Sequence, residues 1–384
     1  MRIAIIGGKL QGVEAAYLAR AAGYHSVVID RDQNAPASGL CDTFILGDAL
    51  DREVLRNAFE GADAVLPAIE DDEVLEHVSR ASGDMGLPFL HDGHAYGISS
   101  SKLESDRMFA ELGIPAPLPW PRCGFPLIGK PSGQSGSQGV RLIEDAPQLD
   151  EWTRLNADEP YVLQQHLPGP SYSLEVVGNG EGCVALQVTE LFMDESYDCC
   201  RVAAPALLAP GVEAEFREIS TRIARRLKIK GVFDVEIILH DNKCKVLEID
   251  ARLPSQTPAA VYHSTGVNLL EVLCRSALED GLPQVDIKRE KAALYQHIYV
   301  DGRGVTVLGE HIMGTCGPLH LERGFLGADM AMTNWRPGVF PWAATLIYEG
   351  ETRKELIFRQ EESIRRAEWR GGRAGEFLNQ QREG

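Results

Sequence analysis

The sequence predicts an α/β protein that begins with a wound parallel sheet and continues into strand-rich parts. The chain has 384 residues, and at roughly 150 residues per domain this length suggests two or three domains. Within residues 1–93, short apolar runs alternate with helical patterns, which is typical of parallel strands joined by crossover helices. After residue 125 strand-like runs dominate, and the runs at 232–239 and 243–249 are separated by an Asp-Asn turn that predicts a paired hairpin.

Composition and charge disfavour several classes of protein. Lys plus Arg is 38 and Asp plus Glu is 56, so the net charge is −18, and a nucleic-acid partner is not expected because polyanion binding needs an excess of cations. Apolar runs stay well short of the roughly 20 residues that span a membrane, and the N-terminus lacks a secretory pattern. The eight cysteines are scattered without a C-x-x-C pair, which favours reduced thiols in the cytoplasm.

The first strand leads into a glycine-rich turn at the start of a helix. Gly7, Gly8 and Gly12 let a ligand approach the backbone where a helix N-terminus attracts anions. A dinucleotide fingerprint would need glycine at position 9, which is Lys9, so a nicotinamide cofactor is disfavoured and a substrate or anion site is favoured over a simple turn. Asp30 ends the second strand, at the distance of a ribose contact. Strands are predicted at 2–6, 26–30, 62–67 and 87–90, with helices at 12–22 and 73–82.

A lysine followed by a flexible loop is the second feature with chemical meaning. Strands are predicted at 125–130 and 140–143, and Lys130 ends the first of them just before a loop of Gly, Ser and Gln. Such a loop can offer several backbone N–H groups to phosphates, and Lys130 adds a positive charge. The lysine precedes the loop, so this is not a P-loop, and a flexible hairpin is the alternative. A capped helix at 101–112 and a proline-rich linker at 113–123 come before it.

An acidic hairpin is the most informative feature. Asp234 and Glu236 share one face of a strand, and Glu248, Asp250 and Arg252 share one face of the next. Four carboxylates that converge on a paired hairpin repel one another unless a cation is present. Oxygen ligands without Cys or His point to Mg²⁺ or Mn²⁺. Two solvated edge faces are the alternative, but the flanking residues are apolar.

The remaining elements complete the predicted chain. Strands are expected at 161–166, 173–177 and 184–192, and helices at 216–227 and 268–278. The charge-dense tail predicts a helix up to Trp369 that frays through Gly371 and Gly372. A solvated terminal helix is the simplest interpretation of this tail, and a helix that docks a partner is the alternative.

Taken in order, these features resemble the ATP-grasp superfamily. The resemblance rests on Lys102, Lys130, the 132–139 loop, Gln164 with Leu167, Glu236, and the Glu248-x-Asp250-x-Arg252 strand. It implies an N-terminal wound α/β domain at 1–93, a small central α+β domain at 94–180, a C-terminal α+β domain with the metal site at 181–350, and a charged tail at 351–384.

Longer strings are similar to one ATP-grasp family, the ligases of pyrrolysine biosynthesis. These strings are the 7–12 turn with residues 14–18, Ser173 to Gly178, Tyr197-Asp198-Cys199, and 249–258, and the similarity runs from residue 1 to about 347. The resemblance implies that ATP phosphorylates the carboxylate of 3-methyl-D-ornithine. The ε-amine of L-lysine then attacks the acyl phosphate and forms an amide.

The resemblance also implies roles for particular residues. Arg252 and Lys130 would be catalytic, and two Mg²⁺ ions would be held by Glu236, Glu248 and Asp250. ATP would contact Lys9, Lys102, Lys130, Ser135, Gly136, Ser137, Gln138, Gly139, Gln164, Gln165 and Leu167. The ornithine-type substrate would meet Ser173, Leu174, Glu175, Asp234, Arg252, Ser255, Gln256 and Thr257, and lysine would meet Leu10, Gln11 and Glu70.

Two departures from the superfamily and two other functions stay open. The adenine hinge, Gln164-Gln165-His166, lacks its usual acid, and Ser171 stands where many relatives have a ribose-binding Glu. A ligase for another diamino acid and a non-catalytic nucleotide-binding module are the alternative functions. The expected partners are small molecules, and a homodimer is left open.

Overall fold

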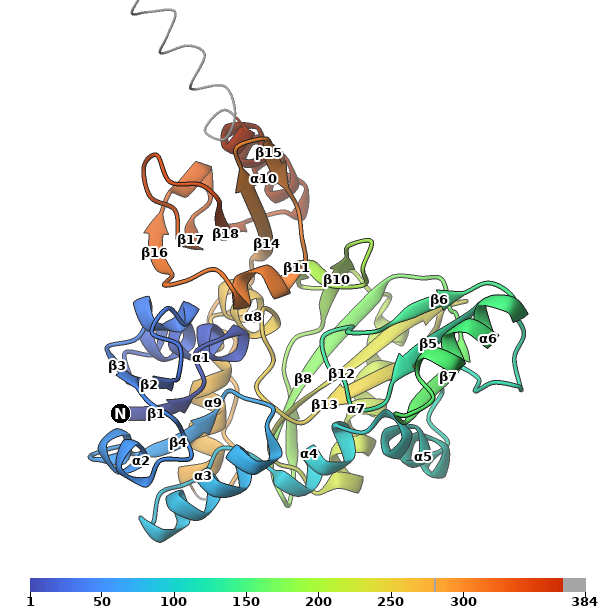
Figure 1. Ribbon diagram of the computed structural model, residues 1–384, viewed down its shortest axis with the longest axis horizontal. Helices are drawn as coiled ribbons and strands as arrows, with labels where there is room; N and C mark the ends of the chain where they lie inside the picture. The colour runs from blue at the N-terminus through green and yellow to red at the C-terminus, as the bar shows by residue number, and fades with distance from the viewer. Residues whose placement is uncertain (280, 369–384) are drawn as a thin grey trace, which may run out of the picture.

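The computed structural model describes residues 1–279 and 281–368, and within them the strands form three sheets. The expected fraying at Gly371 and Gly372 lies outside the described residues. Figure 1 shows the N-terminal sheet at one side of the molecule and the strands β8, β12 and β13 at the other, with helices α8 and α9 between them. None of the helices in the described part of the chain is both long and apolar enough to cross a bilayer.

The N-terminal sheet is parallel, as predicted, with strand order β3-β2-β1-β4. Its central strands are continuous runs of Ile, Val and Ala, which suits burial on both faces. The expected strand at 87–90 makes only an isolated bridge between Val65 and Phe89. The elements are β1 (Arg2–Ile6), α1 (Leu10–Ala21), β2 (His25–Asp30), η1 (Pro36–Gly39), β3 (Thr43–Leu46), α2 (Arg52–Phe59), β4 (Ala64–Pro67) and α3 (Asp72–Asp84).

A small antiparallel sheet, with strand order β6-β5-β7, follows the proline-rich linker. Ser101 caps α5 as predicted, because its side chain accepts a hydrogen bond from the Glu104 N–H. The indole of Trp152 covers the sheet at Gly129, where a Cβ would lie 2.7 Å from the ring. The elements are α4 (Gly93–Ser99), α5 (Lys102–Leu112), β5 (Leu127–Pro131), β6 (Arg141–Ile143), α6 (Ala146–Leu155) and β7 (Tyr161–Gln165).

The large sheet has 11 strands, and its main path runs β13-β12-β8-β10-β11-β14-β18-β17-β16. The strand expected at 184–192 is two strands, because residues 186–188 leave the ladder between them. The domain limits stay a prediction. The strand β8 precedes the limit expected at residue 180, yet it pairs with β12, which lies in the domain expected after that limit. The strands are β8 (Ser171–Asn179), β9 (Cys183–Ala185), β10 (Thr189–Met193), β11 (Cys199–Ala204), β12 (Lys230–His240), β13 (Lys243–Asp250), β14 (Ala292–Asp301), β15 (Gly304–Thr306), β16 (His320–Arg323), β17 (Met330–Thr333) and β18 (Trp342–Gly350).

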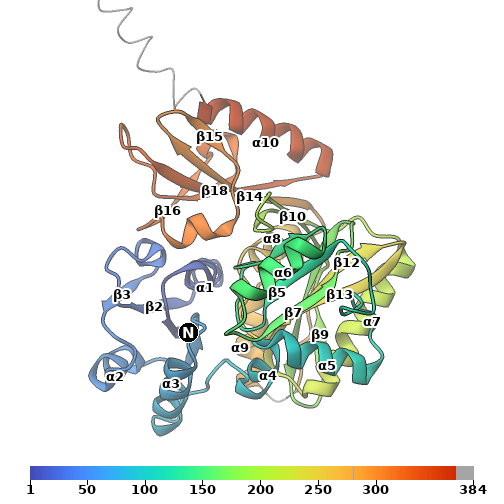
Figure 2. The same ribbon diagram turned by 45° about the vertical axis from the view of Figure 1, so that its right-hand side comes forward.

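Helices cover this sheet and join it to the N-terminal part. The largest apolar cluster contains residues of β1, α1, β8, α8, α9, β14 and β18, so the two sheets share one core. The C-terminal helix packs on β14 and β18 (Figure 2) and buries Leu356 and Ala367, so within the described residues the expectation of a solvated terminal helix was wrong. The helices are α7 (Pro210–Leu227), α8 (Thr257–Thr265), α9 (Leu269–Leu278), α10 (Arg353–Glu368), and the short η2 (Glu310–Gly314) and η3 (Phe325–Gly327).

Buried polar contacts fix α1 against α8. Glu14 is only 1% exposed, and its Oε1 accepts a 2.6 Å hydrogen bond from the Ala259 N–H at the start of α8. One turn further along α1, the Tyr17 hydroxyl lies 2.5 Å from Nε2 of His263. The other ring nitrogen of His263 lies 2.5 Å from Glu349. Because such groups are costly to bury without partners, these contacts define a single packing angle for the interface.

The glycine-rich turn predicts a steric test of the fold. A Cβ at Gly12 would lie 2.2 Å from the carbonyl oxygen of Gly7, so Gly12→Ala must displace the turn. We expect Gly12→Ala to lower the free energy of unfolding by about 1–3 kcal/mol. Gly97→Ala, in an exposed helical position with nothing within 4 Å, is the matched control and should be neutral or stabilising by up to about 1 kcal/mol. Equal urea unfolding midpoints for the two variants would contradict this prediction.

Burial of Glu14 predicts a pH dependence of stability. Burial, opposed by the backbone hydrogen bond, raises the pKa of Glu14 to about 8. The folded protein therefore holds a proton there that the unfolded chain releases above its ordinary pKa of 4.5. Stability is thus lost as the pH rises through this window. Glu14→Gln keeps the acceptor oxygen and removes this titration.

We expect the free energy of unfolding of Glu14→Gln to increase relative to that of the wild type by up to about 1.4 kcal/mol per pH unit between pH 5 and 8. Urea unfolding at both pH values measures the difference, with exposed Glu73→Gln as the control. A difference that does not change with pH would show that Glu14 is ionised throughout.

Candidate active site

Three neighbouring strands carry a grid of polar side chains on one face of the large sheet. Asp234 on β12 is opposite Glu175 on β8 and Asp250 on β13. Two residues further along β12, Glu236 is opposite Ser173 on β8 and Glu248 on β13. Residues directly opposite in antiparallel strands share a face, so the predicted hairpin pairing of the carboxylates is confirmed. This acid grid consists of Ser173, Glu175, Asp234, Glu236, Glu248 and Asp250.

One residue predicted to contact substrate lies on the opposite face. Side chains alternate along a strand, so Leu174 points away from the side on which Ser173 and Glu175 lie. Leu174 is fully buried in an apolar cluster with Phe233 and Val235. The Leu174 side chain therefore does not face the cavity and supports the grid from behind, and a substrate contact at Leu174 stays a prediction.

The acid grid holds more negative charge than its own surroundings neutralise. Burial, with repulsion from Glu248 and Asp250, raises the pKa of Glu236 to about 8. Burial and the Glu248 charge likewise raise the pKa of Asp250 to about 6, although Arg252 opposes them. Burial also acts to raise the pKa of Glu248, but Lys102 and Lys130 outweigh it and lower the value. A cation bound here would remove this penalty.

Two cations of the chain already contact the acid grid. Nζ of Lys102 lies 3.5 Å from Oε2 of Glu248 and donates a 2.6 Å hydrogen bond to the Gln134 carbonyl in the Gly/Ser loop. Nη2 of Arg252 lies 2.9 Å from Oδ2 of Asp250, and its Nε lies 2.7 Å from Oε1 of Glu70. Arg252 therefore links the large sheet to the edge of the N-terminal sheet.

The carboxylates fit a magnesium site that is completed by phosphate oxygens. Within residues 1–279 and 281–368, no three His, Cys, Asp or Glu side chains are arranged so that they could hold a metal ion by themselves. Mg²⁺ is usually held by one or two carboxylates together with water and substrate phosphates. Glu236, Glu248 and Asp250 supply carboxylates of this kind, and the raised pKa values of Glu236 and Asp250 mark uncompensated charge.

The predicted phosphate lysines face one small cavity. Lys102 and Lys130 line it together with Gln164 and Glu248. Gln165 follows on β7, so its side chain points to the other face of the strand. Leu167 is buried, with 6% of its surface exposed. Of the predicted adenine contacts, only Gln164 thus brings its side chain to the lysines.

The Gly/Ser loop folds toward the N-terminal sheet. Ser135, Gly136 and Gln138 line a large cavity of about 560 Å³. The hydroxyl of Ser137 instead donates a 2.7 Å hydrogen bond to the carbonyl of Tyr197. Gly139 adopts φ +73° and packs on the ring of Pro131, where a Cβ would lie only 2.7 Å away, so the end of the loop requires glycine at this position.

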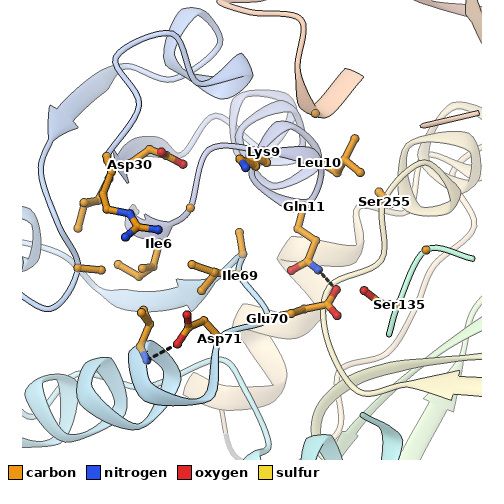
Figure 3. Close-up of a pocket in the computed structure, with 18 of the residues that line it drawn as sticks. Ile6, Lys9, Leu10, Gln11, Asp30, Ile69, Glu70, Asp71, Ser135 and Ser255 are labelled. Atoms are coloured by element: carbon orange, nitrogen blue, oxygen red, sulfur yellow. Dashed lines mark hydrogen bonds between the residues drawn. The ribbon is translucent and has the colours of Figure 1, made fainter. Parts of the chain in front are cut away.

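The large cavity lies at the carboxyl edge of the parallel sheet (Figure 3), where open α/β sheets bind ligands. The residues expected to bind lysine come together there, because Leu10 and Gln11 line the cavity and Nε2 of Gln11 donates a 2.6 Å hydrogen bond to Glu70. Lys9, predicted to contact ATP, also lines this cavity and not the one that holds Lys102 and Lys130. Asp30 accepts a 2.7 Å hydrogen bond from the Gly8 N–H.

A smaller cavity of about 50 Å³ adjoins the acid grid. Ser255 and Glu310 line both this cavity and the large one, so the two meet at these side chains. Nε2 of Gln256 donates a 2.7 Å hydrogen bond to Oε2 of Glu310, and the Ser255 hydroxyl donates to the same oxygen. The residues predicted for the ornithine-type substrate that line it are Ser173, Asp234, Arg252, Ser255, Gln256 and Thr257.

Three residues of the site were not anticipated. Glu310 and His311 lie in η2, within a strand-rich stretch whose local pattern carries no signal of a ligand contact. Asp106 lines the cavity with the two lysines, and burial raises its pKa to about 6 against the pull of Lys130 and Lys102. Helical spacing does place Asp106 four residues after Lys102, and that spacing was the only available clue to it.

Comparisons with known proteins agree with this geometry. A family model described as an ATP-grasp domain matches residues 99–256. A 3-methyl-D-ornithine–L-lysine ligase from Methanosarcina acetivorans is 35% identical over 358 residues, which is 92% of this chain and 94% of the relative. The ligase of the same name from Methanosarcina mazei is 33% identical over 365 residues, which is 94% of each chain.

Solved structures with the same fold are more distant in sequence. N5-carboxyaminoimidazole synthetase from Staphylococcus aureus, complexed with ADP, has a TM-score of 0.71 at 18% identity, covering 94% of this chain and 96% of that chain. An L-amino acid ligase from Bacillus licheniformis has a TM-score of 0.67 at 17% identity, with the same coverage. These likenesses confirm the predicted ATP-grasp fold, whereas the Methanosarcina ligases are similar enough to show the family. The chain therefore belongs to the 3-methyl-D-ornithine–L-lysine ligase family of ATP-grasp enzymes.

Proposed function

We propose that this protein joins the carboxylate of 3-methyl-D-ornithine to the ε-amine of L-lysine, at the expense of ATP, in pyrrolysine biosynthesis. One observation carries the proposal: a small cavity on the acid grid meets a large cavity at the sheet edge, and Arg252 lies between them. A ligase needs such a junction, because an activated carboxyl group and an amine must meet there.

The chemistry divides into two steps. A carboxylate oxygen of the ornithine-type substrate attacks the γ-phosphorus of ATP, and an acyl phosphate and ADP result. The lysine amine then attacks the acyl carbon, and the C–O bond to phosphate breaks with release of inorganic phosphate. The protein contributes mainly by positioning the reactants and stabilising developing charge.

The cations of the site suit the charge that develops. Lys102 and Lys130 would hold phosphate oxygens, and the Gly/Ser loop would add backbone N–H groups. Arg252 is oriented by Asp250 and Glu70, so its guanidinium can stabilise the acyl phosphate. Magnesium held at the acid grid by Glu236, Glu248 and Asp250 would neutralise phosphate charge, and we propose two ions there.

Acidic side chains line both cavities, which suits substrates with two amino groups. Asp234 in the small cavity can accept from an ammonium group of the ornithine-type substrate. Glu175 lies opposite Asp234 but is fully buried and does not line this cavity. Gln11 and Glu70 in the large cavity can bind lysine, with Leu10 along its methylene chain. Each of the eight cysteines is a free thiol, which supports the proposal of a reducing, cytoplasmic compartment. A homodimer remains a prediction for sedimentation analysis.

Mass spectrometry of the reaction products tests the proposal directly. The wild-type protein with MgATP, L-lysine and 3-methyl-D-ornithine should release ADP and form a 3-methylornithyl-lysine adduct that requires both amino acids. Glu248→Gln should lower the rate by at least about 100-fold, because the grid loses a carboxylate that Lys102 and Lys130 keep ionised. Exposed Glu60→Gln should match the wild type.

Other outcomes of this assay select the alternative functions. ADP release without the adduct would point to a ligase for another diamino acid. Absence of ADP release with every amino acid tested would leave a nucleotide-binding module.

A second prediction concerns Glu70, which lines the lysine site and also contacts Arg252. Glu70→Gln removes a charge next to Gln11 and should raise the KM for L-lysine by about tenfold or more, because a hydrogen bond to a charged group contributes about 1.5–3 kcal/mol. Glu73→Gln, which lines the same cavity, is the control and should leave this KM within about twofold. Steady-state kinetics with lysine as the varied substrate measure the effect. An unchanged KM in Glu70→Gln would place lysine elsewhere.

A further inference from the structure

The proposed reaction needs a base that the residues assigned so far do not supply. A lysine ε-ammonium has a pKa near 10.4, so only about one molecule in 2,500 carries the free amine at pH 7. The ammonium must lose a proton before its nitrogen can attack an acyl phosphate. This inference rests on the proposed function and concerns how that proton leaves.

A histidine–aspartate pair faces the large cavity. His311 in η2 lines the cavity together with Gln11 and Glu70. Its Nδ1 lies 2.7 Å from Oδ2 of Asp198, which also accepts the His311 backbone N–H at 3.2 Å. Because a carboxylate only accepts hydrogen bonds, Nδ1 carries the proton and Nε2 is left with the lone pair.

Asp198 is held firmly in place to orient the ring. It ends the tight turn between β10 and β11, and its backbone N–H donates to Asp194 at 3.1 Å. The other oxygen of Asp194 accepts the Gly309 N–H at 2.9 Å, which ties the turn to the segment that carries His311. A Cβ at Gly309 would lie 2.0 Å from the Asp198 carboxyl carbon, so the contact requires glycine.

The free nitrogen of the ring remains available to a ligand. Among the residues that the structure describes, none forms a hydrogen bond with Nε2 of His311, and the side chain is 41% exposed. Gly136 of the Gly/Ser loop packs against this edge of the ring, where a Cβ would lie 2.7 Å from Nε2. Glycine at this position leaves room for Nε2 when the loop lies over the site.

We propose that Asp198 and His311 form a dyad in which His311 is the general base for the lysine ε-ammonium. The N–H bond of the ammonium breaks and an Nε2–H bond forms, so the lone pair that remains on the lysine nitrogen attacks the acyl carbon. Asp198 stabilises the resulting imidazolium, which returns its proton to solvent or to the departing phosphate.

The charged groups around the ring suit this role. The hydrogen bond to Asp198 raises the pKa of His311 against the effect of burial, and the charges of Asp198, Glu310 and Asp194 add to the rise. The Gly/Ser loop at 132–139, which packs against the ring through Gly136, contributes no charged side chain. A base whose pKa approaches the working pH combines a large unprotonated fraction with sufficient proton affinity.

The two half-reactions separate this role from a structural one. Hydroxylamine, which is unprotonated at neutral pH, traps the acyl phosphate as a hydroxamate and needs no base. In His311→Gln, hydroxamate formation from MgATP and 3-methyl-D-ornithine should stay within about threefold of the wild type. The kcat/KM for L-lysine at pH 7 should fall by about 10²–10³-fold and then rise about tenfold per pH unit up to pH 9.

Asp198→Asn should behave in the same way with a smaller loss, and His320→Gln, a histidine of similar exposure, should match the wild type. Parallel loss of hydroxamate and lysine coupling in His311→Gln would assign the ring to loop packing and overturn the proposal. An unchanged pH profile for lysine would overturn it as well. Failure of the wild type to form either product would refute the proposed function itself, which is a separate result.

Discussion

The site depends on one electrostatic constraint, the concentration of carboxylates on three adjacent strands. Five acids of the grid share one buried face, and burial with mutual repulsion raises the pKa of Glu236 and Asp250. Such an arrangement is unfavourable by itself and becomes favourable only when positive charge is supplied. Arg252 and Lys102 supply part of it, and both are drawn from segments outside the grid strands. The grid thereby determines where the other parts of the chain must come together.

That requirement explains how the N-terminal sheet is joined to the rest of the molecule. Arg252 contacts Asp250 on one side and Glu70 on the other, so a single guanidinium spans from the acid grid to the edge of the parallel sheet. Behind it, Glu14 binds the N-terminus of α8, directly after the substrate-lining residues 255–257. The helix dipole favours an acceptor at that end. A shift of α1 would therefore disturb both amino-acid cavities at once.

Local patterns in the sequence were sufficient for the hairpin, the parallel sheet and the capped helix, because each is specified by residues close in the chain. Three kinds of feature were not predictable in this way. The split of β9 from β10 depends on pairing with different stretches of β8, residues 176–178 for β9 and 171–173 for β10. Leu174 was included with its neighbours because the matching string is continuous, although strand alternation turns it into the core. Glu310 and His311 become part of the site through long-range contacts with residues 255–256 and 198, which no local pattern encodes.

The unequal size of the two cavities has a chemical consequence under the proposed function. An acyl phosphate is hydrolysed wherever water reaches it, so it is best formed in the confined space beside the acid grid. The amine needs a wider approach, because it arrives with its hydration shell and must lose a proton. The large cavity at the sheet edge provides that approach, and Ser255 and Glu310 are the only side chains within the described residues that line both spaces. His311, the exposed proton acceptor, is thus kept apart from the activated carboxyl group of the ornithine-type substrate until the lysine amine passes the junction at Ser255 and Glu310.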